Sequence, residues 1–580
     1  NLTKNNIGKS IAIVLDNYVY SYPTVQSEIP NGRSSITGNF TLEEAKDLAN
    51  ILKVGKMPAR ARIVEEAVEG PSLGQEAINS GFLSFILAFI LVLIYMILYY
   101  RKSGFIADLA LLTNLFFLMG VMTSLGAVLT LPGIAGIVLT MGMAVDANVI
   151  IYERIREEIR AGKGIRLAIA DGYKNAYSAI IDGNVTTLLT GIVLYIFGSG
   201  PVQGFATTLI IGILTSLFCA IFISRIIFIW LLDKNKAVNF GSKLTLHAFS
   251  KVNFDFIGNR KKFYLISSIV IVLGLASLFT QGLKFGVDFS GGRTYVVRFD
   301  KDVNTVELRN AISVAMGGET AEVKTFGPTN QVKITTKYLI EEVTEEADST
   351  VSAQLFNAVK PFFSENIDYE TFTSSTDEAK LLGLMSTQKV GPTIADDIKR
   401  SAVLAVVIAL IIIFVYIALR FKKWQFGLGG LVSLTHDSII VISVYSIFYS
   451  ITPFTLEVDQ SFIAAILTII GYSINDTVII FDRIREYTVI HPKNDIKVYM
   501  NNAINSTLGR TINTAGTTLI TLLAMFIFGG EVIRGLVFAL FVGIAVGTYS
   551  SMFTASPVAY DFIKLSKKRA ARKDEIAKTN

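Results

Sequence analysis

Apolar stretches recur along the chain and are separated by two long polar segments. A helix needs roughly 20 mostly apolar residues to cross the hydrocarbon core of a bilayer. The stretches that meet this requirement number eleven: 79–100, 105–128, 132–152, 177–198, 203–232, 263–280, 401–419, 426–450, 461–481, 511–529 and 532–554. Residues 1–78 and about 281–400 are too polar to span. The pattern predicts a polytopic α-helical membrane protein with two polar domains outside the bilayer.

Within the polar segments, strand-like alternation and helix-like periodicity follow one another. The predicted strands are 9–25, 60–69, 293–299 and 331–336, and two of the predicted helices are 305–316 and 343–360. Thr41 and Glu44 form a capping box that opens a further helix, which we expect to end near Val54. Strands and helices interleaved in this way indicate ferredoxin-like α+β domains.

The chain contains an internal repeat. AVDANVIIYERIREE (144–158) resembles INDTVIIFDRIREY (474–487), and Asp146 aligns with Asp476 at an offset of 330. TTLLTGIVLYIFG (186–198) aligns with TTLITLLAMFIFG (517–529) at an offset of 331. Both copies have the same orientation relative to the basic loops, so we expect a parallel six-plus-six helix repeat. Eleven spans are present, and we expect the twelfth upstream.

Lysine and arginine are concentrated in every second loop between the spans. Cytoplasmic loops carry such an excess, so residues 1–78 and 281–400 are expected outside and the C-terminus inside. A polar N-terminal segment on the outside must be exported, yet the sequence opens at Asn1 without a signal peptide. We therefore expect the chain to be the C-terminal part of a longer protein. The net charge of +6 is interpreted as this orientation signal and as contact with membrane lipid, not as nucleic-acid binding.

The composition excludes several classes of protein. The chain is 51% hydrophobic and 17% charged, whereas soluble domains carry about 25% charged residues. A soluble enzyme and a disordered protein are therefore excluded. One cysteine and three widely separated histidines argue against a disulfide scaffold and a metal centre. No nucleophile–base pair is apparent, so we expect no enzyme activity, no cofactor and no catalytic or metal-binding residues.

Two aspartates lie within predicted spans. Asp146 precedes the basic flank at Arg154 by eight residues, and Asp476 precedes Arg483 by seven. At 1.5 Å per residue, these positions are about 12 Å and about 10 Å from the cytoplasmic end. Ionisable groups at such depth are costly and usually functional. Because apolar surroundings disfavour the charged form of a carboxylate, we interpret the pair as parts of a proton path, with Arg510 as a candidate partner.

Further polar residues accompany these aspartates inside the bilayer. The supporting candidates are Asn148, Asn184, His436, Asp437, Asn475, Thr477, Asn513 and Thr514. The alternative interpretation is that such groups only hold helices together through hydrogen bonds. A carboxylate is poorly suited to that role, so the proton-path interpretation is stronger for the two aspartates than for the amides and hydroxyls.

Several long motifs resemble one known family. They are LTLPGIAGIVLTMGMAVD (129–146), GVDFSGG (286–292), VGPTIADDI (390–398), GYSINDTVIIFDRIRE (471–486) and NTAGTTLITLLAMFIFGG (513–530). The chain resembles the bacterial SecD and SecF proteins, the first half SecD and the second half SecF, in the fused SecDF arrangement. The resemblance covers nearly all of the chain and runs in order.

The resemblance implies an auxiliary subunit of the Sec preprotein translocase, from the resistance–nodulation–division superfamily, in the bacterial inner membrane. It implies that the protonmotive force promotes translocation of unfolded preproteins, with the SecYEG translocon, SecA and a YidC-type insertase as partners. The family's proton-transport residues carry over onto Asp146, Asp476 and Arg510. Sodium is the alternative coupling ion, because carboxylate, amide and hydroxyl oxygens also suit it.

The expected organisation divides the chain at the span boundaries. The divisions are 1–78, the C-terminal part of a first periplasmic domain; 79–232, a SecD-like bundle; 233–262, a cytoplasmic linker; 263–280, the first SecF-like span; 281–400, a second periplasmic domain; 401–563, a SecF-like bundle; and 564–580, a basic cytoplasmic tail. SecD proteins have a mobile head in the first periplasmic domain. We expect this head to be absent here.

Two other functions remain open at this stage. One is a proton-driven exporter of small molecules or lipids from the same superfamily, against which the GVDFSGG and SINDT motifs argue. The other is a passive translocon scaffold that moves no ions. A scaffold has no need for Asp146 and Asp476, so replacing them would be harmless.

Overall fold

The computed structural model describes residues 2–15, 18–29, 34–38, 40–54, 65–242, 245–246, 248–249, 252–342, 344–374, 381–490 and 495–579. Two compact units are distinguished, Asn1–Val64 and Glu65–Asn580. In the first unit, a 3-10 turn (η1, Lys4–Asn6) precedes strands β1 (Ile13–Leu15) and β2 (Tyr18–Ser21) and helix α1 (Leu42–Val54).

The capping box predicted at the start of α1 is present. The Thr41 backbone N–H donates to a Glu44 carboxylate oxygen at 2.8 Å, and the Glu44 N–H donates to the Thr41 hydroxyl at 3.3 Å. The helix ends at Val54, as predicted. The single strand expected over 9–25 is wrong: β1 and β2 pair antiparallel within this segment, because alternation alone does not reveal where a strand reverses.

Eleven helices in the described residues are long and apolar enough to cross a membrane, as the sequence predicts. They are α2 (Pro71–Tyr100), α3 (Lys102–Ser124), α4 (Leu131–Arg160), α5 (Ile165–Phe197), α6 (Gly200–Phe218) continued by the π-helix η2 (Cys219–Ile223) and α7 (Ser224–Asp233), α8 (Arg260–Thr280), α13 (Pro392–Arg420), α14 (Trp424–Phe448), α15 (Gln460–Ile490), α16 (Ile496–Phe528), and α17 (Glu531–Ser550) continued by the π-helix η4 (Ser551–Ala555) and α18 (Ser556–Thr579). Several extend past the predicted apolar stretch into polar sequence. Proline fits the first turn of a helix, and it begins α2 and α13 well before the apolar residues start.

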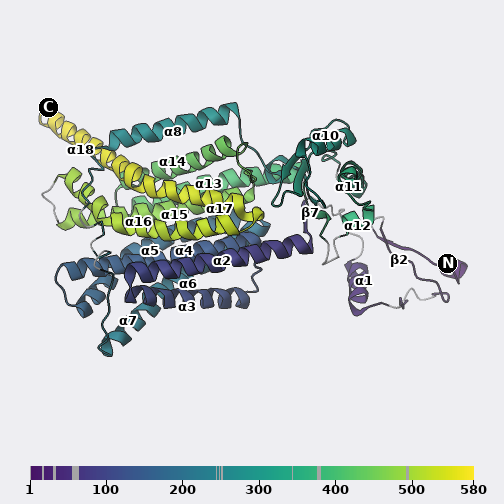
Figure 1. Ribbon diagram of the computed structural model, residues 1–580, viewed down its shortest axis with the longest axis horizontal. Helices are drawn as coiled ribbons and strands as arrows, with labels where there is room; N and C mark the ends of the chain where they lie inside the picture. Colours follow the sequence, from purple (N-terminus) through teal and green to yellow (C-terminus); the bar gives the residue numbers. More distant parts are fainter. Residues whose placement is uncertain are drawn as a thin grey trace. The chain divides into compact units, whose positions relative to one another are not determined.

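The central helices α4 and α15 are the repeat-related pair that carries the two aspartates. In each, 89% of the most apolar window is buried, a larger share than in any other span described. Gly142 of α4 packs against Thr518 of α16, and Gly471 of α15 packs against Thr187 of α5. Helix α4 of the first half therefore packs against α16 of the second half, and α15 of the second half packs against α5 of the first. The two halves are in contact around α4 and α15 (Figure 1).

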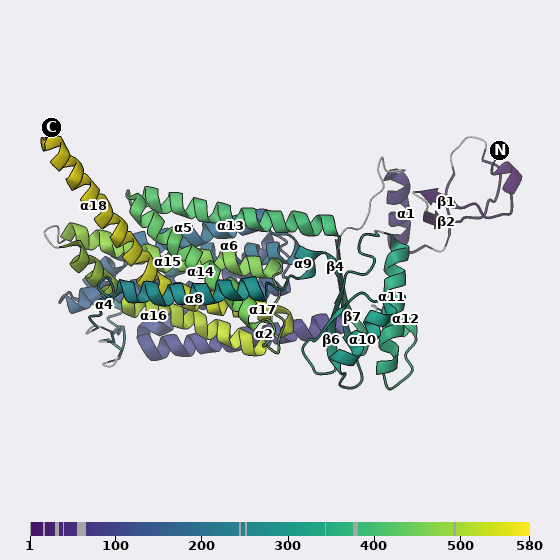
Figure 2. The ribbon, with the colours of Figure 1, turned by 90° about the horizontal axis from the view of Figure 1, so that it is seen from above.

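An α/β domain lies at one end of the bundle (Figures 1 and 2). Its strands are β3 (Glu65–Glu69), β4 (Gly292–Arg298), β5 (Glu322–Thr325), β6 (Gln331–Thr336) and β7 (Gly383–Val390). They form one antiparallel sheet in the order β3-β7-β4-β6-β5. The helices are α9 (Val287–Ser290), α10 (Thr305–Ala315), α11 (Glu345–Val359) with the 3-10 turn η3 (Lys360–Phe362), and α12 (Tyr369–Thr373).

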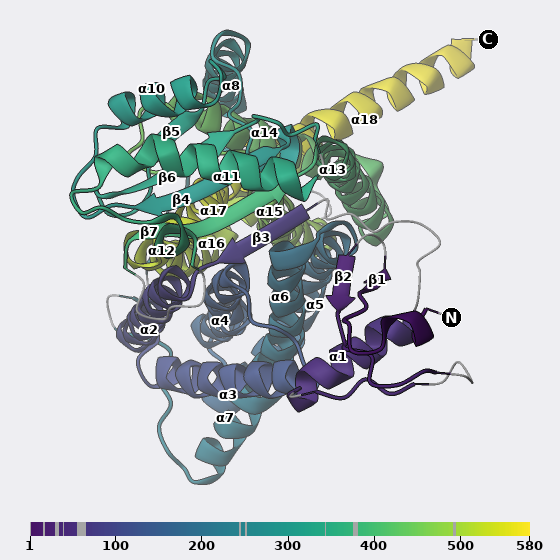
Figure 3. The same cartoon turned by 90° about the vertical axis from the view of Figure 1, so that its right-hand side faces the viewer.

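The second outside segment has the predicted ferredoxin-like order. The sequence β4-α10-β5-β6-α11-β7 builds the sheet order β7-β4-β6-β5. Helices α10 and α11 cover the sheet face turned away from the bundle (Figure 3), where Val297, Leu308 and Leu355 form part of a common apolar core. Strand β3 comes from the first outside segment and adds to the edge of this sheet beside β7. Sequence pattern did not reveal this pairing, because β7 itself was not predicted as a strand.

Three spans continue directly into the sheet. β3 leads into α2 through Gly70, whose N–H donates to the Met385 carbonyl of β7 at 2.7 Å. β7 leads into α13 at Pro392, and α8 leads through α9 into β4.

At the other end of the bundle, the linker after α7 binds both halves. The Arg156 guanidinium donates to the Phe240 carbonyl at 2.7 Å, and the Asn501 amide oxygen accepts from the Phe256 N–H at 2.8 Å.

Candidate functional site

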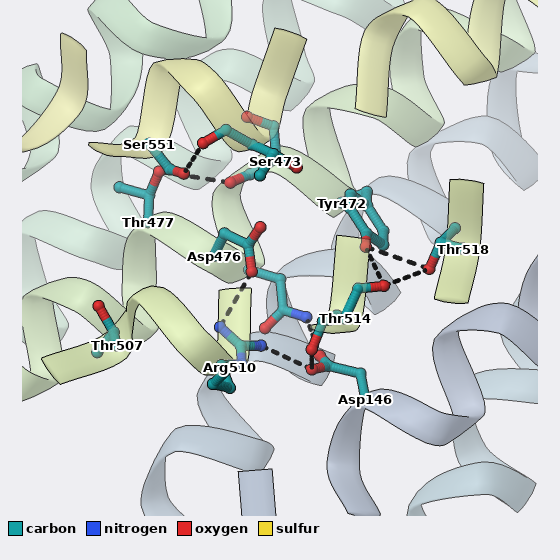
Figure 4. A network of polar contacts seen from close by, with 12 residues as sticks. Asp146, Tyr472, Ser473, Asp476, Thr477, Thr507, Arg510, Thr514, Thr518 and Ser551 are labelled. Atoms are coloured by element: carbon teal, nitrogen blue, oxygen red, sulfur yellow. Dashed lines mark hydrogen bonds and ion pairs between the residues drawn. The ribbon is translucent and has the colours of Figure 1, made fainter. Parts of the chain in front are cut away.

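Asp146, Asp476 and Arg510 meet at the centre of the bundle. They come from α4, α15 and α16, and each is 5% exposed or less. One guanidinium nitrogen of Arg510 donates to Asp146 Oδ1 at 2.7 Å, and another donates to Asp476 Oδ1 at 3.0 Å. Figure 4 shows Arg510 between the two carboxylates. A single cation thus bridges the central helices of both repeat halves inside the bilayer.

The two carboxylates are unequally satisfied. Asp146 also accepts hydrogen bonds from the Thr514 hydroxyl at 2.8 Å and the Asn475 amide at 2.7 Å. Asp476 Oδ2 is buried and has no hydrogen-bond partner among the described residues. A buried charged oxygen without a donor costs free energy, so a proton bound there neutralises the charge and breaks no hydrogen bond at that oxygen.

The centre is asymmetric because the two repeats differ at the position of the arginine. At the offset of 331 that aligns Thr186 with Thr517, Arg510 falls on Ala179 of α5. The first half therefore supplies no second arginine at the equivalent position. One cation serves two carboxylates, and it can release one of them while remaining paired with the other.

Three of the eight predicted supporting residues lie in or beside the centre. Asn475 and Thr514 belong to the centre, as their bonds to Asp146 show. Asn513 lies beside it, accepting from the Tyr95 hydroxyl at 2.7 Å and donating to the Tyr100 hydroxyl at 3.4 Å.

Three others, Asn148, Asn184 and Thr477, make no hydrogen bond to either carboxylate in the described structure. Thr477 bonds the Ser473 carbonyl of its own helix at 3.4 Å, and Asn184 bonds the Ile180 carbonyl at 2.8 Å. Asn148 is buried, and its amide oxygen has no partner among the described residues.

His436 and Asp437 form a separate cluster in the second half. His436 Nδ1 lies 2.9 Å from Asp437 Oδ1, and His436 Nε2 lies 3.1 Å from the Ser267 hydroxyl. Asp437 Oδ2 accepts from the hydroxyls of Ser473 at 2.6 Å and Ser550 at 2.7 Å. These contacts join α8, α14, α15 and α17, so the cluster connects four helices of one half and does not bridge the halves.

Four charged side chains form a ring between the ends of α4 and α15, which we call the charge ring: Arg154, Glu157, Arg483 and Glu486. Arg154 pairs with Glu157 at 3.1 Å and with Glu486 at 3.0 Å. Arg483 pairs with Glu157 and with Glu486, each at 2.8 Å. Because Arg154 and Glu157 recur as Arg483 and Glu486 at an offset of 329, the ring repeats each contact across the two halves. Sequence analysis treated these arginines only as orientation signals, although the repeated RIRE motif was visible.

A cavity of about 500 Å³ lies between the charge ring and the aspartate–arginine centre. Its lining includes Glu153, Glu157, Arg483 and Asn505, and also Arg510. Arg510, which holds both aspartates, therefore borders a polar cavity at the end of the bundle that carries the basic loops. Such a cavity can bring water and ions near the centre.

A further ion pair joins the halves between α5 and α13. Asp182 accepts from Arg420 of α13 through both carboxylate oxygens, at 2.7 and 2.6 Å. The Tyr416 hydroxyl donates to Asp182 Oδ1 at 3.1 Å. This pair is a contact between repeat halves that sequence periodicity could not locate.

The chain matches known proteins over nearly its whole length. Residues 51–234 and 369–565 match the family described as "Protein export membrane protein SecD/SecF, C-terminal", and residues 276–303 match the SecD/SecF GG motif. The protein translocase subunit SecDF of Bacillus subtilis is 34% identical over 564 residues, which cover 93% of this chain and 71% of the relative. The SecDF of Thermus thermophilus is 35% identical over 575 residues, which cover 99% and 74%.

A solved structure agrees with the fold. The crystal structure of SecDF from Thermus thermophilus, described there as a translocon-associated membrane protein, superposes with a TM-score of 0.77 at 33% identity, covering 97% of this chain and 73% of that one.

One expectation is corrected by these matches. Residues 1–59 match the family described as the SecDF P1 head subdomain. The expectation from sequence analysis that the head is absent is therefore wrong. The sequence analysis grouped 60–69 with the preceding residues, whereas β3 belongs to the sheet of the other unit.

Proposed function

Because the chain belongs to the SecD/SecF family of protein-export membrane proteins, we propose that it is a translocase accessory that uses an ion gradient to promote preprotein translocation across the bacterial inner membrane. The observation that carries the proposal is the bridge that Arg510 makes between Asp146 and Asp476. Its partners are the SecYEG translocon, SecA, a YidC-type insertase and the unfolded preprotein. It is not an enzyme. The α/β domains lie on the periplasmic side and the C-terminus lies in the cytoplasm.

The ion acts by neutralising a carboxylate. When a proton binds Asp476, the Arg510–Asp476 ion pair is lost while the Arg510–Asp146 pair remains. The contact between α4 and α15 then weakens on one side, and the halves can shift relative to one another. Moving one elementary charge across the membrane potential supplies about 2.3 kcal/mol per 100 mV, which is enough to bias two arrangements of similar free energy.

The cavity beside the charge ring supports a route for the ion on the cytoplasmic side. The unpartnered Asp476 Oδ2 supports this carboxylate as the first to take the proton. Protons are the proposed coupling ion, because a bridging guanidinium already occupies the space between the carboxylates and a proton needs no further ligands. Sodium requires several oxygen ligands and would have to displace the guanidinium.

The test uses cells that lack their own SecD and SecF and express the full-length protein. Export of a secreted reporter is compared for wild type, Asp146→Asn and Asp476→Asn, with the protonmotive force intact and collapsed. We expect both variants to insert normally, to stall export as the knockout does, and to respond no further to collapse at this step. Asp108→Asn, at another buried intramembrane carboxylate outside the centre, is the matched control and should export normally.

Normal export by both variants would overturn the proposal and favour the passive scaffold. Replacing sodium with potassium in the medium separates the ions. Export that persists without sodium supports protons, whereas export that stops assigns sodium.

A further inference from the structure

Helix α15 carries residues of both the aspartate–arginine centre and the charge ring. It runs from Gln460 to Ile490 and carries Asp476 near its middle and Arg483 and Glu486 of the charge ring toward one end. Its other end, at Gln460, meets the α/β domain. What holds this end decides whether a movement of α15 reaches the outer sheet.

Asp288 binds both the start of α15 and the sheet. Its Oδ2 accepts a hydrogen bond from the Gln460 backbone N–H at 3.1 Å. Its Oδ1 accepts from the Gln388 side-chain amide of β7 at 2.9 Å. The side chain is buried, with 8% exposed. The first N–H groups of a helix lack intrahelical partners and favour a negative charge, so this carboxylate satisfies α15 while it holds a strand of the outer domain.

Two backbone contacts surround Asp288. The Val458 N–H donates to the Lys284 carbonyl at 2.7 Å, and the Gly286 N–H donates to the Val458 carbonyl at 3.0 Å. They form a parallel bridge between Phe285 and Val458. We call the contacting segments, residues 284–288 and 457–460, the outer joint.

A side-chain ion pair adds a third link at the outer joint. The Lys333 ammonium of β6 donates to Glu457 at 2.7 Å. Strands β6 and β7 of the sheet and the α9 segment are therefore all connected to the residues at the start of α15.

The outer joint is not needed to tether the domain. The sheet is already continuous in the chain with α2, α8 and α13. None of these three carries a carboxylate of the centre, whereas α15 carries Asp476. The joint therefore adds a connection that runs directly from the Asp476 carboxylate along a single helix to the sheet.

We propose that Asp288 is the positioning residue through which movement of α15, set off by ion binding at Asp476, reaches the outer sheet. The proposal deepens the proposed function and rests on it. The carboxylate does not bind the ion itself. It keeps the start of α15 and strand β7 moving as one body, so that neutralising Asp476 displaces the domain that faces the preprotein.

The test separates ion movement from export. Asp288→Ala and Gln388→Ala each remove the side-chain link between the joint and β7. Inverted membrane vesicles report ion movement through a pH-sensitive dye, and a secreted reporter reports export from cells. We expect export to fall about tenfold, as loss of a hydrogen bond to a charged group changes an equilibrium by about that factor. Ion movement should stay at the wild-type level.

Two controls keep the test decisive. Asp302→Asn removes an exposed carboxylate of the same domain that accepts only from Thr329 in the described structure, and it should change neither readout. Limited trypsin digestion checks that Asp288→Ala keeps its outer domain folded. If it does not, Gln388→Ala, which keeps the hydrogen bond between Asp288 of α9 and the Gln460 N–H of α15, decides the question alone.

The outcomes distinguish this inference from the proposed function. Loss of export with ion movement retained supports Asp288 as the positioning residue. Normal export by Gln388→Ala and Asp288→Ala, with Asp476→Asn stalled, overturns the inference and leaves the proposed function standing. Loss of both readouts together in a folded variant also overturns it, because Asp288 would then act on ion movement itself. Normal export by both Asp146→Asn and Asp476→Asn overturns the proposed function first.

Discussion

At the scale of the residue, one guanidinium serves two carboxylates. Arg510 is buried between Asp146 and Asp476, and no second arginine stands at the repeat-related position, which is Ala179. A buried charge is tolerable only while it is paired. Loss of Arg510 therefore leaves two uncompensated carboxylates among apolar helices, whereas loss of either aspartate leaves a single ion pair.

We predict that Arg510→Gln destabilises the protein more than either aspartate substitution. Removing one partner of a buried ion pair costs about 3–5 kcal/mol, and here two carboxylates lose their cation. Thermal unfolding of the purified protein in detergent measures the effect. Adding Asp146→Asn and Asp476→Asn to Arg510→Gln should raise the midpoint again, because the uncompensated charges are removed. A triple variant less stable than Arg510→Gln would contradict this account.

The outer joint contains a carboxylate that titrates near neutral pH. Burial raises the pKa of Asp459 from 3.8 to about 7, and the nearby Asp288 and Glu457 carboxylates raise it further, against the Lys333 ammonium and the Phe462 backbone N–H, which lower it. Tyr445 of α14 also faces this carboxyl group. The folded protein therefore holds a proton that the unfolded chain has released between pH 3.8 and about 7.

We predict that the stability supplied by protonated Asp459 is lost as pH rises through this window. The folded state binds more protons there, so the free energy of unfolding falls with rising pH and is flat above about 7. Asp459→Asn removes the titration. The difference in thermal midpoint between wild type and Asp459→Asn should change from pH 4 to about pH 7, whereas Asp302→Asn should run parallel to wild type. Parallel curves for Asp459→Asn would exclude this role.

At the scale of the element, close helix packing positions the site. Gly183 of α5 faces Asn475 of α15 so closely that a Cβ atom would overlap the amide oxygen. Asn475 in turn donates to Asp146 of α4. The absence of a side chain on α5 therefore sets the position of an amide that holds a carboxylate on a third helix.

We predict that Gly183→Ala weakens export and lowers the thermal midpoint. Overpacking costs about 1–3 kcal/mol, and displacing Asn475 removes one hydrogen bond from Asp146. Gly516→Ala is the matched control, because no atom lies within 4 Å of its Cβ position on α16. Alanine there should be neutral or stabilising by about 0.5–1 kcal/mol. Equal effects of the two substitutions would show that helix propensity, not contact with Asn475, is responsible.

At the scale of the whole molecule, the halves are joined by contacts as well as by the chain. Arg510 bonds Asp146, Arg420 bonds Asp182, and the charge ring crosses from α4 to α15. The linker is bound to both halves: the Phe240 carbonyl accepts from Arg156 of α4, and the Phe256 N–H donates to Asn501 of α16. The start of the linker is therefore held by the first half and its end by the second.

We predict that the halves assemble when they are made as separate chains. A cut between Ser242 and Val252 leaves Phe240 with the first half and Phe256 with the second. A tag on one half should recover the other from detergent extracts and restore export. Arg483→Glu, which opposes Glu157 and Glu486 in the charge ring, should reduce recovery. Failure of the unsubstituted halves to copurify would mean that covalent connection, and not these contacts, holds the bundle together.

Local pattern was sufficient for much of this architecture. Span length, basic loops and the repeat indicated eleven spans, two related halves and Asp146 with Asp476 at matching depth, because bilayer thickness and helix rise constrain every span in the same way. The capping box at Thr41 and the ferredoxin-like order after α8 were equally local. All of these features depend on residues that are close together in the sequence, so the local pattern was enough to predict them.

Contacts between distant segments were decided only in the folded molecule. That Arg510 binds both carboxylates depends on how α16 packs against α4 and α15, and that β3 joins the sheet of the other half depends on a strand, β7, with no strong alternation. The charge ring and the bond of Asp288 to the start of α15 join residues more than a hundred positions apart. Sequence pattern indicates whether each segment forms a helix or a strand. Which distant residues meet is decided by helix crossings and close glycine contacts, which form only when all the spans pack together.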